Sequence, residues 1–157
     1  MLRQVKLALE VLIIVAIIVA PTAALSEAII SKEDADRIFS MTKAQWGAYA
    51  LKVNNPPGWK FEVSNHYTGA GLMGFDPKTG RGLSVQPLYD HDNSPPVELI
   101  VGSYYPAGSF PQFTDQLKKQ LEQAAMKDLG PMYSVTASSA ILPKFDGVEL
   151  IVSKAKR

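Results

Sequence analysis

The N-terminal apolar run constrains this chain most, because it decides how many residues remain to fold. Residues 11–20 are all apolar, and Arg3 and Lys6 precede them with positive charge. Pro21 ends the run, and small side chains follow it. This order of positive charge, apolar segment, helix breaker and small residues is typical of a secretory signal peptide. We therefore predict that residues 1–26 direct the chain out of the cytoplasm.

Removal of this signal would leave residues 27–157 as a single domain, with cleavage expected near residues 26–28. An uncleaved membrane anchor is the alternative interpretation of residues 1–26. A spanning helix needs about 20 apolar residues, whereas the segment from Leu7 to Ala20 is shorter and carries Glu10. The predicted location is the periplasm or the extracellular medium, and the alternative is anchoring in the inner membrane.

Charge and cysteine content exclude several classes of function. The chain has 16 Lys and Arg, 15 Asp and Glu, and no cysteine. Nucleic-acid-binding proteins usually carry a basic stripe; none is visible here, so we predict no nucleic-acid partner. Without cysteine the chain has no disulfide, no thiolate nucleophile and no cysteine-ligated zinc. Stability must then come from apolar burial and backbone hydrogen bonds.

Two segments have helical periodicity. Residues 31–53 begin with Ser31, a favourable N-cap, and place apolar side chains at three- and four-residue spacings. The second helix is predicted to start at a capping box of Ser109 and Gln112 and to end before Gly130. Its apolar residues recur at steps of four: Phe113, Leu117, Leu121, Ala125 and Leu129.

The remaining segments alternate in the manner of strands joined by turns. Predicted strands lie at 59–67, 83–88, 97–105, 132–142 and 148–154, with 72–75 continuing the strand pair after a glycine-rich break. The order α-β-β-β-α-β-β predicts an α+β fold. We expect a mostly antiparallel sheet of about five strands with two helices packed on it.

This order resembles the Mog1/PsbP-like family, which includes DcrB-type exported proteins. The resemblance rests on Pro57-Gly58-Trp59 before the first strand, the long helix at 109–129, and Asp146-Gly147 before the last strand. It covers about residues 56–154 and implies an accessory or assembly role without catalysis. The chain departs from the pattern in lacking the lipidated cysteine of DcrB-type members, and it ends after the last strand, where that family usually has more.

Residues 69–74 spell G-x-G-x-x-G, the pattern of a dinucleotide-binding turn. Such a site needs a helix that starts at the glycines and presents its N-terminus to phosphate. Asp76-Pro77 and a turn follow at once, which leaves no room for a helix. We interpret residues 69–74 as a flexible or bulged connection between strands, and no cofactor is predicted.

Asp90, His91 and Asp92 put three candidate metal ligands in one loop. Metal sites of this kind usually need further ligands from elsewhere in the chain, so a solvated loop is the preferred interpretation and these residues are weak candidates. A serine hydrolase would have to use His66 or His91 as its general base, because the chain has only 2 histidines. No catalytic residue is predicted.

Tyr89, Tyr104 and Tyr105 are the candidate binding residues, because tyrosine combines an apolar ring with a polar tip. The predicted function is an exported, non-enzymatic domain that binds or helps to assemble a partner, either an envelope protein or a cell-wall component. A small periplasmic hydrolase and a membrane-tethered subunit of an envelope complex are the alternatives. Contact with a membrane is expected only through the N-terminal segment, if that segment is retained.

Overall fold

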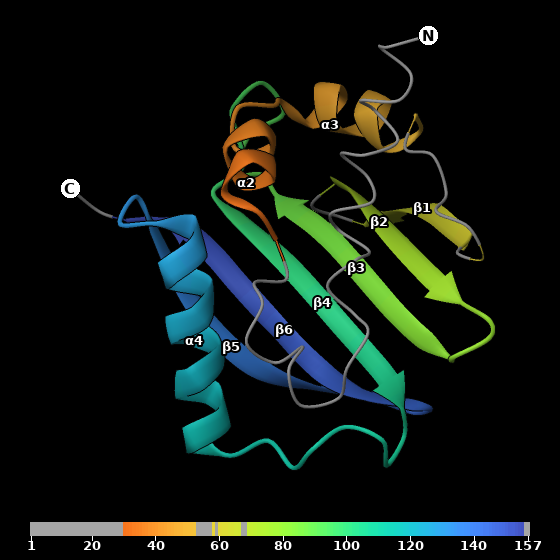
Figure 1. The fold of residues 1–157 in the computed structure, drawn as a ribbon. Coiled ribbons are helices and arrows are strands. Elements are labelled where there is room, and N and C mark those ends of the chain that lie inside the picture. Colours follow the sequence, from red (N-terminus) through yellow and green to blue (C-terminus); the bar gives the residue numbers. More distant parts are fainter. Residues whose placement is uncertain (1–29, 53–57, 59, 67–68, 156–157) are drawn as a thin grey trace, which may run out of the picture.

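A six-stranded antiparallel sheet forms the centre of the molecule, and helices pack against it (Figure 1). The structure is a computed structural model that describes residues 30–52, 58, 60–66 and 69–155. Residues 1–26, the predicted signal peptide, lie outside this part of the chain. No helix among the described residues is long and apolar enough to cross a membrane.

The described elements follow one another as two short helices, four strands, a long helix and two strands. Their bounds are α2 (Lys32–Ile38), α3 (Lys43–Ala50), β1 (Lys60–His66), β2 (Gly69–Asp76), β3 (Arg81–Leu88), β4 (Glu98–Pro106), α4 (Asp115–Leu129), β5 (Tyr133–Leu142) and β6 (Phe145–Lys154). The α+β class is confirmed. The expected five strands and two helices are wrong, because the described residues form six strands and three helices.

The first predicted helix, residues 31–53, is two helices. Helix α2 ends at Ile38, and Thr42 starts α3 with a capping box. The Gln45 side chain accepts a hydrogen bond of 2.8 Å from the Thr42 N–H, and the Thr42 hydroxyl accepts one of 3.4 Å from the Gln45 N–H. A capping box in which Thr42 and Gln45 satisfy each other's free amides favours a new helix start over a continuous helix.

The glycine-rich segment at 69–74 is a regular strand rather than the expected connection. Strand β2 pairs with β1 from Phe75 opposite Lys60 to Gly69 opposite His66. Gly74 fits into this strand because the Phe61 ring lies directly over it, in the space that a Cβ would occupy. Glycine inside a strand often marks such a close approach. Interpreting these glycines as a connection between strands therefore predicts too few strands.

Helix α4 begins later than its capping-box prediction. Thr114, and not Ser109, is its N-cap, and the Thr114 hydroxyl accepts a hydrogen bond of 3.2 Å from the Leu117 N–H. The predicted end is confirmed, since α4 stops at Leu129 and Gly130 follows with φ 80°. Four of the expected apolar positions are buried on one side of the helix: Leu117, Leu121, Ala125 and Leu129.

The last strand of the chain is not at an edge of the sheet. The strand order is β1-β2-β3-β4-β6-β5, so α4 carries the chain from β4 past a vacant position to β5, and β6 returns into that position. Strand β6 pairs with β4 on one side and with β5 on the other. The sheet therefore has β1 and β5 as its edge strands.

One face of the sheet carries the helices and the core (Figure 1). Strand residues alternate between the two faces, and those of the central strands that point to the helices are nearly fully buried: Leu99, Val101, Val148, Leu150 and Val152. Phe39 and Trp46 from the short helices join them. Trp46 also donates its indole N–H to the Ala70 carbonyl at 2.5 Å, which fixes α3 over β2.

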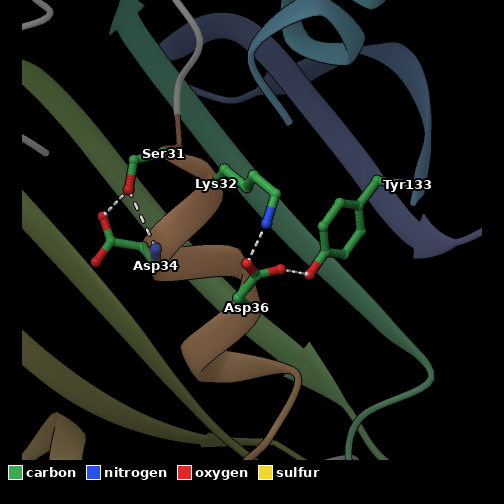
Figure 2. Close-up of polar contacts among 5 residues, drawn as sticks. All are labelled: Ser31, Lys32, Asp34, Asp36 and Tyr133. Carbon is green, nitrogen blue, oxygen red and sulfur yellow. Dashed lines mark hydrogen bonds and ion pairs between the residues drawn. The ribbon is translucent and has the colours of Figure 1, made fainter. Parts of the chain in front are cut away.

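A polar cluster holds α2 against the start of β5 (Figure 2). The Asp36 carboxylate accepts hydrogen bonds from the Lys32 ammonium and, at 2.5 Å, from the Tyr133 hydroxyl. Lys32 and then Tyr133 hold the pKa of Asp36 below its usual value. At the N-terminus of α2, the Ser31 hydroxyl accepts a hydrogen bond of 3.1 Å from the Asp34 N–H and so caps the helix.

Candidate functional site

A cavity of about 280 Å³ lies between the segment that leads into α4 and the hairpin of β5 and β6. Four lining residues precede α4, and five belong to the two strands: Phe110, Pro111, Gln112, Phe113, Ser139, Ala140, Ile141, Asp146 and Gly147. The lining is mainly apolar, and Asp146 is its one ionisable side chain. Ligand sites commonly combine a mainly apolar lining with a few polar groups.

Three hydrogen bonds fasten the start of the lead-in segment to the end of the sheet. The Ala107 N–H donates to the Lys144 carbonyl at 3.1 Å, and the Ser109 N–H to the Pro106 carbonyl at 2.9 Å. The Gly108 N–H donates to the Asp146 carboxylate at 2.6 Å. Gly108 has φ +79°, a conformation that L side chains rarely adopt. Asp146 thus holds the lead-in segment in place as well as lining the cavity.

Tyr105, one of the predicted binding residues, lies behind this cavity. Its ring contacts Phe110, with 5.0 Å between ring centroids. The Arg81 guanidinium carbon lies 4.6 Å from the Tyr105 ring centroid, and the Arg81 side chain donates a 2.9 Å hydrogen bond to the Tyr105 hydroxyl. Tyr105 therefore supports one wall of the cavity and does not itself line it.

Strand β5 borders the cavity and forms an edge of the sheet. Its ten residues, Tyr133–Leu142, carry no charge. The Ala137 N–H donates to the Glu122 carboxylate of α4 at 2.9 Å, so a helix side chain covers the edge at this one point. Beyond it Ala140 is buried, but Ser139 is exposed, Ile141 is 81% exposed and Leu142 is 43% exposed.

Tyr104 points to the opposite face of the sheet, because neighbouring strand residues alternate. Its side chain is buried there, and its hydroxyl donates a hydrogen bond of 2.8 Å to Glu149 and lies 3.1 Å from the Ser84 hydroxyl. The ring has room because Gly102 lacks a Cβ at the place where the Tyr104 hydroxyl lies. Burial raises the pKa of Tyr104 to about 12, and the Glu149 carboxylate acts in the same direction.

Tyr89 is part of the core rather than of a surface. It is 9% exposed, and its hydroxyl has no hydrogen-bond partner in the described part of the chain. Burial raises its pKa to about 12. The three predicted tyrosines therefore do not form one binding surface: Tyr89 is in the core, Tyr104 is buried on the face of the sheet opposite the helices, and Tyr105 supports the cavity.

The weak metal candidates lie in an exposed loop after β3. Asp90, His91 and Asp92 are all exposed, and Asp92 forms an ion pair of 2.9 Å with Lys43 of α3. Among the residues that the structure places, no group of three or more His, Cys, Asp or Glu side chains is arranged to hold a metal ion. His66 belongs to β1, but its side chain is outside the described part.

The sequence interpretation missed the residues that line the cavity. Phe110 and Phe113 were expected to enter a helix, yet they form an extended lead-in because Thr114 starts α4. One signal was available, namely the absence of charge from Leu129 to Pro143, which is unusual for the edge of a sheet. Nothing in the sequence could show that residues 110–113 and 139–141 meet.

No family model, curated protein or solved structure matches this chain. The resemblance to the Mog1/PsbP-like family therefore stays a prediction that rests on its quoted residues alone.

Proposed function

We propose that this chain is an exported domain that acts by binding a protein partner rather than by catalysis. One observation carries the proposal: an uncharged edge strand, β5, runs beside a mainly apolar cavity. The exposed side chain of Ile141 lies where β5 borders the cavity. Exposed apolar groups beside a concave surface favour association with a partner. The proposal keeps the export that the N-terminal sequence predicts and moves the binding site from the tyrosines to β5.

The chemistry of the cavity supports binding over catalysis. Asp146 is the one ionisable group among the lining residues, and it already accepts the Gly108 N–H. General acid–base catalysis requires a titratable group aimed at a substrate, commonly with a second group that orients it. A lone, occupied carboxylate beside aromatic side chains is better suited to orienting a bound chain.

Site-specific photocrosslinking in the producing cell tests the proposal. A photoreactive phenylalanine analogue at position 141 should form a crosslink to one identifiable envelope protein. The same analogue at Met126, which is 40% exposed on α4, is the matched control. Identical crosslinks from both positions, or none from position 141, would contradict the proposed binding site.

N-terminal sequencing of the mature protein tests the export step. A start near residues 26–28 is expected, with the protein recovered from the periplasm or the medium. An intact N-terminus on a membrane-bound product would favour the tethered alternative, and a cytosolic product would exclude export.

A further inference from the structure

We propose that β5 binds an extended segment of its partner as an additional strand, along residues 138–142, and that the cavity receives one apolar side chain of that segment. This inference rests on the proposed function, because it specifies how the same site binds. Strand addition at a sheet edge derives affinity from main-chain hydrogen bonds and specificity from pockets for alternate side chains.

The direction of the backbone groups on β5 follows from the Glu122 contact. The Ala137 N–H reaches Glu122 of α4 and therefore points away from β6. Alternate residues of a strand turn their N–H groups the same way, so the Ser139 and Ile141 N–H groups also point outward. Within the described residues no hydrogen bond reaches these two amides.

The composition of β5 leaves this edge able to pair. Monomeric proteins usually protect an edge strand with charged residues, proline or a bulge. Strand β5 has none of these: it is uncharged, it contains no proline, and it pairs residue for residue with β6 from Tyr133 to Leu142. The contact of Glu122 with Ala137 protects one amide of the edge.

The cavity lies where a side chain of the added strand would enter it. A residue paired with Ser139 or Ile141 would carry its side chain on the same face as theirs, because paired residues share a face. Ser139 and Ile141 both line the cavity, together with Phe110 and Phe113. At about 280 Å³ it is just below the size range of pockets for whole small molecules, and it suits a single apolar side chain.

A second copy of this chain fits the edge poorly. Glu122 occupies the outward amide of Ala137, and Pro143 has no N–H to donate at the other end. Symmetric pairing of two β5 strands would be confined to the few residues between these points. A contact of so few residues buries less surface than the roughly 1,200 Å² or more that specific, stable interfaces bury. A single extended segment needs only this length of strand to pair.

The experiment uses random eight-residue peptides displayed on phage and selected on the purified exported protein. Enriched peptides should carry apolar residues at every second position. Their affinity is then measured by fluorescence polarisation, with the free synthetic peptide and with a version methylated on alternate backbone nitrogens. Methylation removes the main-chain donors that strand addition uses and should abolish binding.

Three variants test the edge itself. Ser139→Pro removes an outward N–H that the ladder with β6 does not use, and Ile141→Lys places a charge on the open edge; each should weaken peptide binding about tenfold or more. Thr136→Lys adds the same charge to an exposed position of the same strand on the other face, and should leave binding within about twofold.

Glu122→Ala should have the opposite effect. It frees the Ala137 N–H for the added strand and should tighten peptide binding about threefold to tenfold, the effect of one net hydrogen bond. A residue with a purely structural role would not produce such a gain. Thermal melts confirm that each variant is folded before its affinity is compared.

Each other outcome overturns the inference. Equal binding by the wild type and by S139P and I141K would place the peptide elsewhere, while the crosslink from position 141 would still support the proposed function. A failure to enrich any peptide would exclude strand addition in the same way. A concentration-dependent dimer that I141K abolishes would identify a second copy as the occupant.

Discussion

Tyr133, the first residue of β5, donates a hydrogen bond of 2.5 Å to Asp36 of α2, 97 positions earlier in the chain. The Tyr133 ring also contacts Phe39, with 5.4 Å between centroids. One side chain thus joins the edge strand to the first described helix through a polar and an apolar contact.

Removal of this link should destabilise the fold measurably. Tyr133→Phe deletes the hydroxyl but keeps the ring, and should lower the free energy of unfolding by about 1 kcal/mol. Asp36→Ala should couple to it, so that the double variant loses less than the sum of the two single losses by about 0.5–1 kcal/mol. Urea denaturation of the four proteins measures the coupling.

Low pH should weaken the interaction energy between Tyr133 and Asp36. The pKa of Asp36 is lowered by Lys32 and Tyr133, so the folded chain favours the ionised carboxylate. Its contribution to stability is therefore present above about pH 4 and is lost as the pH falls through the lowered pKa. A coupling that stays constant from pH 7 to pH 2 would contradict this assignment.

Two tyrosine-to-phenylalanine substitutions should change the stability of the fold in opposite directions. Tyr89→Phe removes a buried hydroxyl with no partner among the described residues, and should stabilise the fold by about 1 kcal/mol. Tyr104→Phe removes the donor to Glu149 and should destabilise the fold by about 1 kcal/mol. Chemical denaturation measures both, and a loss of stability in Y89F would show that its hydroxyl has a partner.

High pH should destabilise the fold, and Tyr89 and Tyr104 should both contribute to this loss. Burial raises the pKa of Tyr89 and of Tyr104 from 10.0 to about 12. Because the folded chain holds these protons more tightly, each tyrosine stabilises the fold below pH 10, and this contribution is lost as the pH rises toward 12. The difference is equivalent to about 2–3 kcal/mol per tyrosine. Burial, with the hydrogen bond to Asp36, also raises the pKa of Tyr133. Absorbance at 295 nm should therefore show late ionisations, of which double Phe substitution at Tyr89 and Tyr104 should remove two, and unfolding in urea should remove all.

Two glycine substitutions provide a matched comparison of packing. A Cβ at Gly147 would overlap the Ser103 carbonyl oxygen, so Gly147→Ala should destabilise the fold by about 1–3 kcal/mol. A Cβ at Gly47 would meet nothing within 4 Å, and Gly47→Ala should stabilise α3 by about 0.5–1 kcal/mol. If Gly147→Ala and Gly47→Ala had equal effects on the melting temperature, β6 would have to shift away from β4 to accommodate the added Cβ.

Local patterns in the sequence predicted the positions of most elements. The alternation in residues 97–105 and the four-residue spacing from Leu117 to Leu129 each correspond to an observed strand or helix. The errors fall where two local signals compete. Thr42 lies within the helical periodicity of residues 31–53, yet its side chain caps α3. The glycines of 69–74 suggested a break, yet they lie in a strand, and Gly74 makes room for the Phe61 ring.

The candidate site depends on contacts between distant segments, and the sequence could not supply these. Strand β5 is an edge only because β6 lies between it and β4, a choice that no periodicity reveals. The cavity exists only because Thr114 starts α4 late and leaves Phe110 and Phe113 outside the helix. The alternation that predicted β4 also implied that Tyr104 and Tyr105 point to opposite faces, and this was the one available indication that the tyrosines do not act together.

The place of β6 between β4 and β5 has a consequence for how fast the sheet assembles. Strand β5 pairs in the sheet with β6 alone, and β4 needs β6 for its second neighbour. The pairing of β5 with β6 is local in the chain, whereas the pairing of β4 with β6 spans α4 and β5. Completion of the sheet therefore requires a non-local pairing step, and such steps slow folding because the intervening loop must close first.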